Sequence, residues 1–206
     1  MKSFPKVRIT TGWLTSRYFG IHSLGTHHIP ETGPFVVLAN HASFLDPYMI
    51  GYTSEKREVG FMAKDELFRN PVFGWIIRNC GAFPVKRGKQ DGEAIQRFHD
   101  FLNSGKPLCL YPEGTRTLDG QLQPAKKGVG MLLYNARVPA IPAYIDGTFK
   151  SFPKGAFFPK PGRITVYYGP AVPLDDLYAL SPEKPTYREI ADRVMKHIAD
   201  LKPIAG

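Results

Sequence analysis

Residues 35–47 read FVVLANHASFLDP, a short apolar run followed by a turn that holds a histidine and an aspartate five residues apart. Residues 35–39 have the length and the β-branched content of a buried strand, so His41 is expected where that strand ends. Pro47 suits the first turn of a helix. The sequence therefore predicts that His41 and Asp46 lie on a turn between a strand and a helix.

The residues alone leave two interpretations of this turn open. In the first, Asp46 folds back to the imidazole of His41, fixes its tautomer and leaves the other ring nitrogen free to act as a general base. In the second, Asp46 only caps the N-terminus of the following helix, and His41 is an ordinary loop histidine. The rest of the chain has to decide between them.

Strands and helices alternate along most of the sequence. Further strands are expected at residues 58–62, 82–86, 107–112, 140–145 and 163–169. Helices are expected at residues 46–53, 64–67, 72–79, 89–104 and 127–137, and from a capping box at residues 186–189 to Pro203. This alternation predicts a single α/β domain over residues 1–206, layered, with a largely parallel, mixed sheet flanked by helices.

The N-terminal residues 4–19 mix aromatic and apolar side chains with lysine and arginine. This composition suits a short helix lying at a membrane interface, and it suits equally a helix that packs on the core. Residues 1–30 are therefore expected to be an N-terminal helical segment, with membrane contact as one of its two possible roles.

Charge and cysteine content narrow the setting of the protein. With 27 Lys and Arg against 18 Asp and Glu, the net charge of +9 favours an anionic partner. Cys109 sits in an apolar run and is expected to be a buried, inert thiol, and two cysteines in all suggest a reducing, cytoplasmic setting. No apolar stretch approaches the ~18 residues that span a bilayer, and no signal pattern is visible.

Several charged residues are expected at one edge of the sheet. His41, Arg87 and residues 113–116 each follow a predicted strand directly, and parallel strands end at a common edge where ligands bind. Arg87 and Arg116 carry planar guanidinium groups that match phosphate oxygens bidentately. Glu113 could accept a hydrogen bond from a substrate hydroxyl or form a salt bridge with Arg116.

Lys64, Lys126 and Lys127 could add positive charge there, although each also fits an ordinary solvated surface lysine.

Other chemistries fit the sequence less well. Residues 88–90 lack the first glycine and the hydroxyl of a nucleotide phosphate loop, and no histidine spacing implies a metal. No serine or cysteine has the context of a covalent nucleophile, which favours direct transfer. The basic residues form no long run and the aromatic residues no RNA-binding pattern, so nucleic acid is not expected as a partner.

Four ordered blocks of sequence resemble those of a known family. They are NHASFLD at residues 40–46, GAFPVKR at 81–87, PEGTR at 112–116 and VPAIP at 138–142. These blocks resemble the glycerolipid acyltransferases, most closely the 1-acyl-sn-glycerol-3-phosphate acyltransferases, over about residues 35–168. The resemblance implies a glycerol-3-phosphate acyltransferase-like domain on the cytoplasmic surface of a membrane.

The resemblance also implies an activity. A member of this family moves a fatty acyl chain from acyl-CoA or acyl-carrier protein to the sn-2 hydroxyl of lysophosphatidic acid, which forms phosphatidic acid without a further cofactor. The acceptor could also be glycerol-3-phosphate, another lysophospholipid or an amino-lipid. A membrane-surface binding protein without catalysis is the remaining alternative.

By the same resemblance, each site residue receives a role. His41 is expected to take the proton from the acceptor hydroxyl, with Asp46 orienting its ring. The remaining residues are expected to bind the acceptor: Lys64, Arg87 and Arg116 at its phosphate, and Glu113, Gly114 and Thr115 along its site.

Membrane attachment is expected to be peripheral, on the inner face of the cell membrane. Many family members carry hydrophobic segments before the first block, whereas this chain has about forty residues and no spanning helix there. The N-terminal residues, together with residues 149–154 and 157–160, are the expected contacts with anionic lipid.

Overall fold

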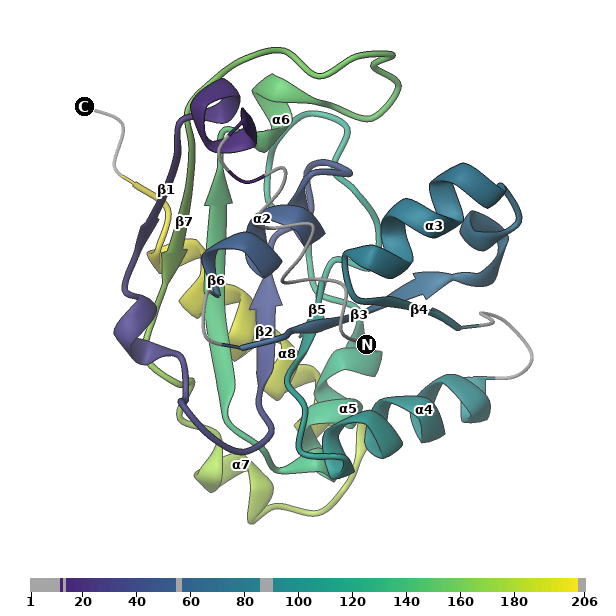
Figure 1. Ribbon diagram of the computed structural model, residues 1–206. Coiled ribbons are helices and arrows are strands. Elements are labelled where there is room, and N and C mark those ends of the chain that lie inside the picture. Colours follow the sequence, from purple (N-terminus) through teal and green to yellow (C-terminus); the bar gives the residue numbers. More distant parts are fainter. Residues whose placement is uncertain (1–11, 13, 55–56, 86–90, 204–206) are drawn as a thin grey trace.

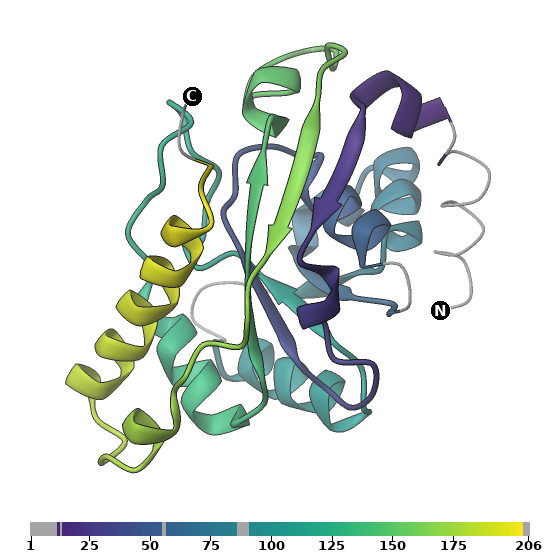
Figure 2. The same ribbon diagram turned by 90° about the vertical axis from the view of Figure 1, so that its left-hand side faces the viewer.

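The computed structural model describes residues 12, 14–54, 57–85 and 91–203, which form one sheet with helices on both of its faces (Figures 1 and 2). The strand order across the sheet is β1-β7-β6-β2-β5-β3-β4. The strands are β1 (Ile21–Leu24), β2 (Val36–Ala39), β3 (Gly60–Lys64), β4 (Ala82–Val85), β5 (Leu108–Leu110), β6 (Ala140–Asp146) and β7 (Ile164–Tyr168).

The sheet is largely parallel and mixed, which confirms the predicted fold class. Strands β6, β2, β5, β3 and β4 run parallel, whereas β7 is antiparallel to β6 and β1 is parallel to β7. Strand β2 lies at the centre, where Val37 pairs with Cys109 on one side and with Ile141 on the other. The carboxyl ends of five strands therefore face the same edge of the sheet.

Helices flank the sheet as predicted, although the two short helices at residues 148–151 and 175–178 were not predicted. They are α2 (Asp46–Thr53), α3 (Pro71–Asn79), α4 (Asp91–Asn103), α5 (Lys127–Ala136), α6 (Thr148–Ser151), α7 (Asp175–Tyr178) and α8 (Lys184–Asp200), with 3₁₀ helices η1 (Thr26–His28) and η2 (Asp65–Phe68). The structure does not describe the predicted start of the fourth helix, at residues 89–90. Among the described residues, no helix is both long enough and apolar enough to cross a bilayer.

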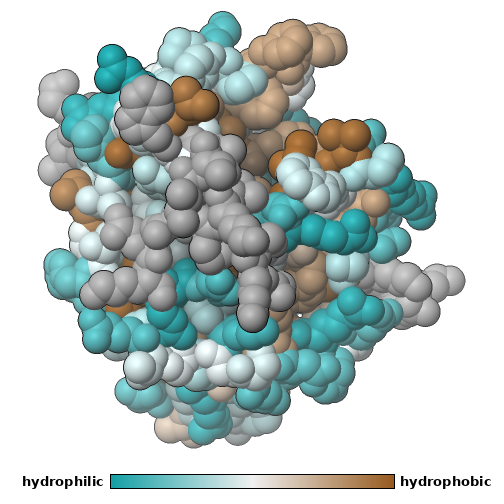
Figure 3. All heavy atoms as spheres, in the orientation of Figure 1, coloured by the Kyte–Doolittle hydropathy of each residue, from teal (hydrophilic) through white to brown (hydrophobic). Residues whose placement is uncertain are grey.

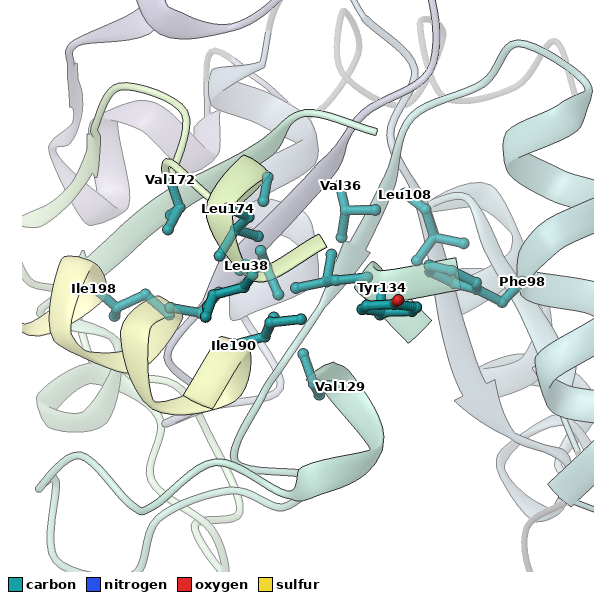
Figure 4. Packing of buried hydrophobic residues seen from close by; sticks show 14 of the residues in the cluster. Val36, Leu38, Phe98, Leu108, Val129, Tyr134, Val172, Leu174, Ile190 and Ile198 are labelled. Carbon is teal, nitrogen blue, oxygen red and sulfur yellow. The ribbon is translucent and has the colours of Figure 1, made fainter. Parts of the chain in front are cut away.

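Strand β2 carries core on both faces. Val36 and Leu38 pack with side chains from α4, α5 and α8, as Figure 4 shows. Phe35 and Val37 point the other way, toward the face that α2 covers. A strand buried on both sides needs apolar residues at every position, so residues 35–39 read as an unbroken apolar run.

The N-terminal prediction is partly wrong. Residues 14–19 are helical, but residues 21–24 form β1, which pairs with β7 at the sheet edge. Two of its four residues, His22 and Leu24, are exposed, so this strand has too little apolar pattern to be recognised. Phe19 is buried in the core, whereas residues 1–11 and 13 of the predicted interfacial segment lie outside the described residues.

Several other boundaries differ from the prediction, and β5 covers residues 108–110 rather than 107–112. Strand β3 covers residues 60–64 rather than 58–62, because its pairing with β4 runs from Phe61 to Lys64. The predicted capping box at residues 186–189 is wrong, since α8 begins at Lys184 with Glu183 as its N-cap. Thr186 is buried inside the first turn, and its hydroxyl donates to the carbonyl oxygen of Ser181.

Candidate active site

Asn40 fixes the chain directly after β2. Its side-chain amide donates to the carbonyl oxygen of Ile145 (3.1 Å) and its side-chain oxygen accepts from the N–H of Ile145 (2.7 Å). These bonds continue the pairing of β2 with β6 by one residue beyond the strand. The turn that follows therefore starts from a fixed point at the sheet edge.

Asp46 folds back onto this turn. Its Oδ2 accepts hydrogen bonds from Nδ1 of His41 (2.7 Å), from the N–H of Ala42 (2.7 Å) and from the N–H of Ser43 (2.8 Å). Because Oδ2 is the acceptor, Nδ1 of His41 carries the hydrogen and Nε2 is left with its lone pair. The interpretation of Asp46 as a helix cap is wrong, since the N-cap of α2 is Leu45.

The imidazole ring of His41 is also held from its face. It stacks on the ring of Tyr111, with the centroids 4.0 Å apart and the planes at 16°. The Asp46 side chain is fully buried, whereas 19% of the His41 side chain remains exposed. The ring is thus fixed in position and orientation and still open to a substrate.

Glu113 joins the turn to the segment that follows β5. Its Oε1 accepts from the N–H of His41 (2.8 Å) and its Oε2 from the N–H of Gln123 (3.1 Å). In return, the N–H of Thr117 donates to the carbonyl oxygen of His41 (2.9 Å). Burial raises the pKa of Glu113 to about 7, against the two N–H donors, which lower it.

Arg116 lies against the same turn. Its guanidinium carbon is 3.6 Å from the centroid of the Phe44 ring, a cation–π contact. The ion pairs of the described residues do not include one between Arg116 and Glu113, so the salt-bridge alternative is wrong. Burial lowers the pKa of Arg116, and its buried Nη1 has no hydrogen-bond partner within the described chain. An unpaired buried donor is unfavourable, so an anion beside Arg116 would be stabilised.

Gly114, Thr115 and Lys64 lie at or near this edge. Gly114 adopts a left-handed conformation (φ 70°) in a turn closed by its N–H and the carbonyl oxygen of Tyr111, and Thr115 is exposed beside it. Lys64 is the last residue of β3 and is exposed. Arg87 lies outside the described residues.

Three contact residues were not singled out from the sequence. Phe44, Tyr111 and Thr117 touch His41 or Arg116 through contacts that join separate segments. The sequence places Tyr111 in the strand expected at residues 107–112, and nothing in the local sequence marks it as a stacking partner. Asn40, by contrast, carries a local signal, because a polar amide directly follows a buried apolar run.

Comparison with known proteins adds a family to this geometry. A family model described as Acyltransferase matches residues 20–146. The chain is 33% identical over 135 residues to the protein named 1-acyl-sn-glycerol-3-phosphate acyltransferase BAT2, chloroplastic, of Brassica napus, covering 64% of this chain and 39% of that protein. The 1-acyl-sn-glycerol-3-phosphate acyltransferase of Streptococcus pneumoniae is 29% identical, covering 79% of this chain and 59% of that protein.

A solved structure is similar throughout. The 1-acyl-sn-glycerophosphate acyltransferase PlsC from Thermotoga maritima superimposes with a TM-score of 0.72 at 25% identity, covering 100% of this chain and 86% of that one. The curated relatives are longer, and this chain spans 39% of the first and 59% of the second.

Proposed function

The chain belongs to the acyltransferase family, and we propose that it acylates the sn-2 hydroxyl of lysophosphatidic acid to form phosphatidic acid. The proposed acyl donor is acyl-CoA or acyl-carrier protein. The observation that carries the proposal is the fixed imidazole of His41, bonded through Nδ1 to Asp46 and stacked on Tyr111. The names of the relatives support lysophosphatidic acid as the acceptor.

His41 acts in this proposal as a general base. Its Nε2 takes the proton from the acceptor hydroxyl while that oxygen attacks the thioester carbonyl carbon. The carbon–sulfur bond then breaks, and the proton passes from Nε2 to the departing thiolate. Asp46 accepts from Nδ1 throughout and stabilises the transient imidazolium, so no acyl group becomes attached to the protein.

The acceptor phosphate is proposed to bind at Arg116, with Lys64 and Arg87 adding charge. The buried, unpaired Nη1 of Arg116 supports this role, because a phosphate oxygen would complete its bonding. Gly114 and Thr115 would line the same site. Both oxygens of Glu113 already accept backbone N–H groups, so we propose that Glu113 holds the wall of the site and leaves the substrate to its neighbours.

We also propose that the protein docks on a membrane through exposed apolar side chains. Phe157 and Phe158, in the predicted lipid-contact segment, are 92% and 82% exposed. Helix α3 adds Val72, Trp75 and Ile76, which were not predicted as exposed. Figure 3 shows hydrophobic atoms gathered where Figure 1 has α3 and the loop after α6. These five residues are called the apolar surface below.

The apolar surface is connected to the catalytic turn. Phe73 of α3 packs edge-on against Phe44, with the ring centroids 5.6 Å apart. Phe44 in turn carries the guanidinium of Arg116. An acceptor lipid that enters from a bilayer at α3 would thus be separated by one layer of side chains from Arg116, which is proposed to bind its phosphate.

Activity with a panel of lysolipids tests the function. The protein would be incubated with radiolabelled acyl-CoA, or with radiolabelled acyl-carrier protein, and with lysophosphatidic acid, glycerol-3-phosphate, other lysophospholipids or an amino-lipid. We expect phosphatidic acid as the main product, and we expect His41→Ala to lower the rate roughly 10²- to 10⁴-fold, the usual contribution of a general base. His22→Ala, exposed on the edge strand β1, is the matched control and should retain the full rate.

Two results would overturn parts of the proposal. Full activity of His41→Ala would exclude His41 as the general base. The absence of transfer to every lysolipid would exclude the proposed acyltransferase activity. Transfer to a different acceptor would correct the substrate alone.

A further inference from the structure

A hollow lies where the N-terminal ends of α5 and α8 meet. It is a pocket of about 540 Å³, lined by residues 113, 115, 123–127, 184 and 188. Thr115 also lies at the proposed acceptor site, so the two sites share this residue. Its walls carry four basic side chains, Lys126, Lys127, Lys184 and Arg188, and one acidic side chain, Glu113. It is called the α5/α8 pocket below.

The packing of the two helices builds this pocket. A Cβ atom at Gly130 of α5 would overlap the carbonyl oxygen of Tyr187 in α8, so only glycine permits this crossing. Arg188 also donates from Nη1 to the carbonyl oxygen of Ala125 (3.2 Å), which ties α8 to the chain just before α5. The basic residues are therefore brought together by the core of the fold.

The charges in the α5/α8 pocket are not balanced within the described chain. Lys126 is the N-cap of α5 and Lys127 its first residue, with no acidic residue in the first turn. Lys184 opens α8 beside the N-cap Glu183, whose side chain makes no cap hydrogen bond. Cations at a helix N-terminus are unfavourable because that end of the helix dipole is already positive. The described ion pairs include Arg188 with Asp192, but none with these three lysines. An anion in the pocket would compensate both the lysines and the two helix ends.

We infer that the α5/α8 pocket binds the phosphate groups of coenzyme A when the acyl donor is acyl-CoA. This inference rests on the proposed acyl transfer. Glu113 lines the pocket and also accepts the N–H of His41, so the pocket adjoins the catalytic turn. Coenzyme A places several phosphates at one end of a flexible arm and the thioester at the other, which matches a cationic pocket beside a general base.

The position of the pocket argues against a membrane headgroup. None of the five residues of the apolar surface lines the α5/α8 pocket. The pocket belongs to the side of the sheet that α5 and α8 cover, whereas α2 covers the other side. A headgroup held in a bilayer at α3 would thus meet different residues.

Binding of free coenzyme A, without any acyl group, tests the inference. Isothermal titration would compare wild-type full-length protein with Lys127→Glu, Lys184→Glu and the control Lys196→Glu, an exposed lysine on α8 outside the pocket. We expect each pocket variant to weaken binding about tenfold or more, as for the loss of a charge-assisted hydrogen bond, and the control to bind as wild type. Added salt should weaken wild-type binding.

A second ligand tests recognition of the phosphate on the ribose. Dephospho-coenzyme A, which lacks the phosphate on the ribose, should bind wild type more weakly than coenzyme A does. In Lys184→Glu, the difference in affinity between the two ligands should be smaller. Lys127→Gln and Lys184→Gln, which remove charge without reversing it, should show smaller losses in the same direction. Melting temperatures would confirm that these exposed positions leave the fold intact.

Three outcomes would overturn the inference. Equal affinity of the pocket variants and wild type for coenzyme A would exclude the pocket. Equal binding of coenzyme A and dephospho-coenzyme A, together with wild-type binding that added salt does not weaken, would exclude phosphate recognition. Loss of carrier-protein binding in the pocket variants, with coenzyme A binding unchanged, would assign the pocket to a protein donor. If coenzyme A binds as expected but no lysolipid is acylated, the proposed function fails and the pocket stands.

Discussion

The turn at residues 41–46 and the apolar surface depart from the usual distribution of residues in opposite ways. The turn buries a carboxylate, Asp46, and supplies Oδ2 of that carboxylate with three N–H donors from its own chain. The apolar surface leaves Trp75 and Phe157 more than half exposed. Buried charges and exposed large apolar groups are both unusual, and both mark places where a protein acts on something else.

The difference between these regions lies in what completes them. Hydrogen bonds and packing within the chain already hold the His41 ring, so the turn is organised before any substrate binds. The apolar surface has no such cover in the described structure, and we propose that lipid supplies it. Changes in the turn should therefore affect the chemical step, and changes in the apolar surface should affect attachment.

Among changes that keep His41 in place, Asp46→Asn should give the largest effect. An asparagine can still accept the N–H groups of Ala42 and Ser43 through its side-chain oxygen, but it carries no negative charge and would not stabilise the imidazolium of His41. We expect kcat with lysophosphatidic acid to fall roughly 10²- to 10³-fold, within the range of general-base catalysis. Steady-state kinetics would measure the loss, and vesicle sedimentation should show unchanged membrane binding.

Asp200→Asn, at the exposed end of α8, is the matched control and should keep the wild-type kcat. An unchanged kcat in Asp46→Asn, or a simultaneous loss of vesicle binding, would break the separation between the two regions.

The strand, turn and helix around His41 could be predicted because their signals are local. A run buried on both faces, a proline in the first helical turn and the spacing of His41 and Asp46 all lie within residues 35–47. Strand β1 could not be predicted in the same way. Its four residues become a strand only because β7, more than a hundred residues away in the chain, pairs with them.

The contacts that complete the site could not be predicted from the sequence either. Tyr111 under the His41 ring and Phe44 under Arg116 depend on how the ends of β2 and β5 approach each other. The sequence of α3 predicts an apolar helix, and only the packed structure reveals that Val72 and Trp75 face outward. Burial is a property of the whole fold, so it cannot be read from the composition of one helix.

Arg116→Ala should give the next largest effect, on substrate affinity. The guanidinium is proposed to bind the acceptor phosphate, and loss of a hydrogen bond to a charged group costs roughly 1.5–3 kcal/mol. The apparent KM for lysophosphatidic acid should therefore rise about 10- to 100-fold, with a smaller change in kcat. Arg116→Lys, which keeps the charge but loses the planar fork, should fall between alanine and wild type. An unchanged KM in both variants would remove Arg116 from the proposed phosphate site.

Glu113→Gln should change how stability depends on pH. The carboxyl pKa is raised from 4.5 in the unfolded chain to about 7 in the folded one, so the folded chain binds more protons between these values. The contribution of Glu113 to the unfolding free energy is thus complete below pH 4.5 and is lost as the pH rises through about 7. This contribution is at most roughly 3 kcal/mol. Denaturant unfolding from about pH 5 to about pH 8 would measure this slope.

The variant has no carboxyl to titrate, so its slope over that window should be flatter than that of wild type. Glu93→Gln, on the surface of α4, should keep the wild-type slope. If the unfolding free energies of wild type and Glu113→Gln change with pH in parallel, burial of this carboxyl does not cause the pH dependence of stability.

Trp75→Ser should give the smallest effect, and it tests the other side of the comparison. Trp75 is 64% exposed on α3, and burying part of its ring in lipid would contribute only part of the roughly 1.5–3 kcal/mol expected for a large apolar side chain. Binding to vesicles that contain anionic lipid should weaken about threefold to tenfold, as measured by sedimentation. Leu180→Ser, similarly exposed between α7 and α8, should bind as wild type. If both variants lose vesicle binding equally, the attachment is not specific to α3. If only Trp75→Ser loses vesicle binding, and its kcat on detergent-dispersed substrate is unchanged, then lipid contact and chemistry depend on separate residues.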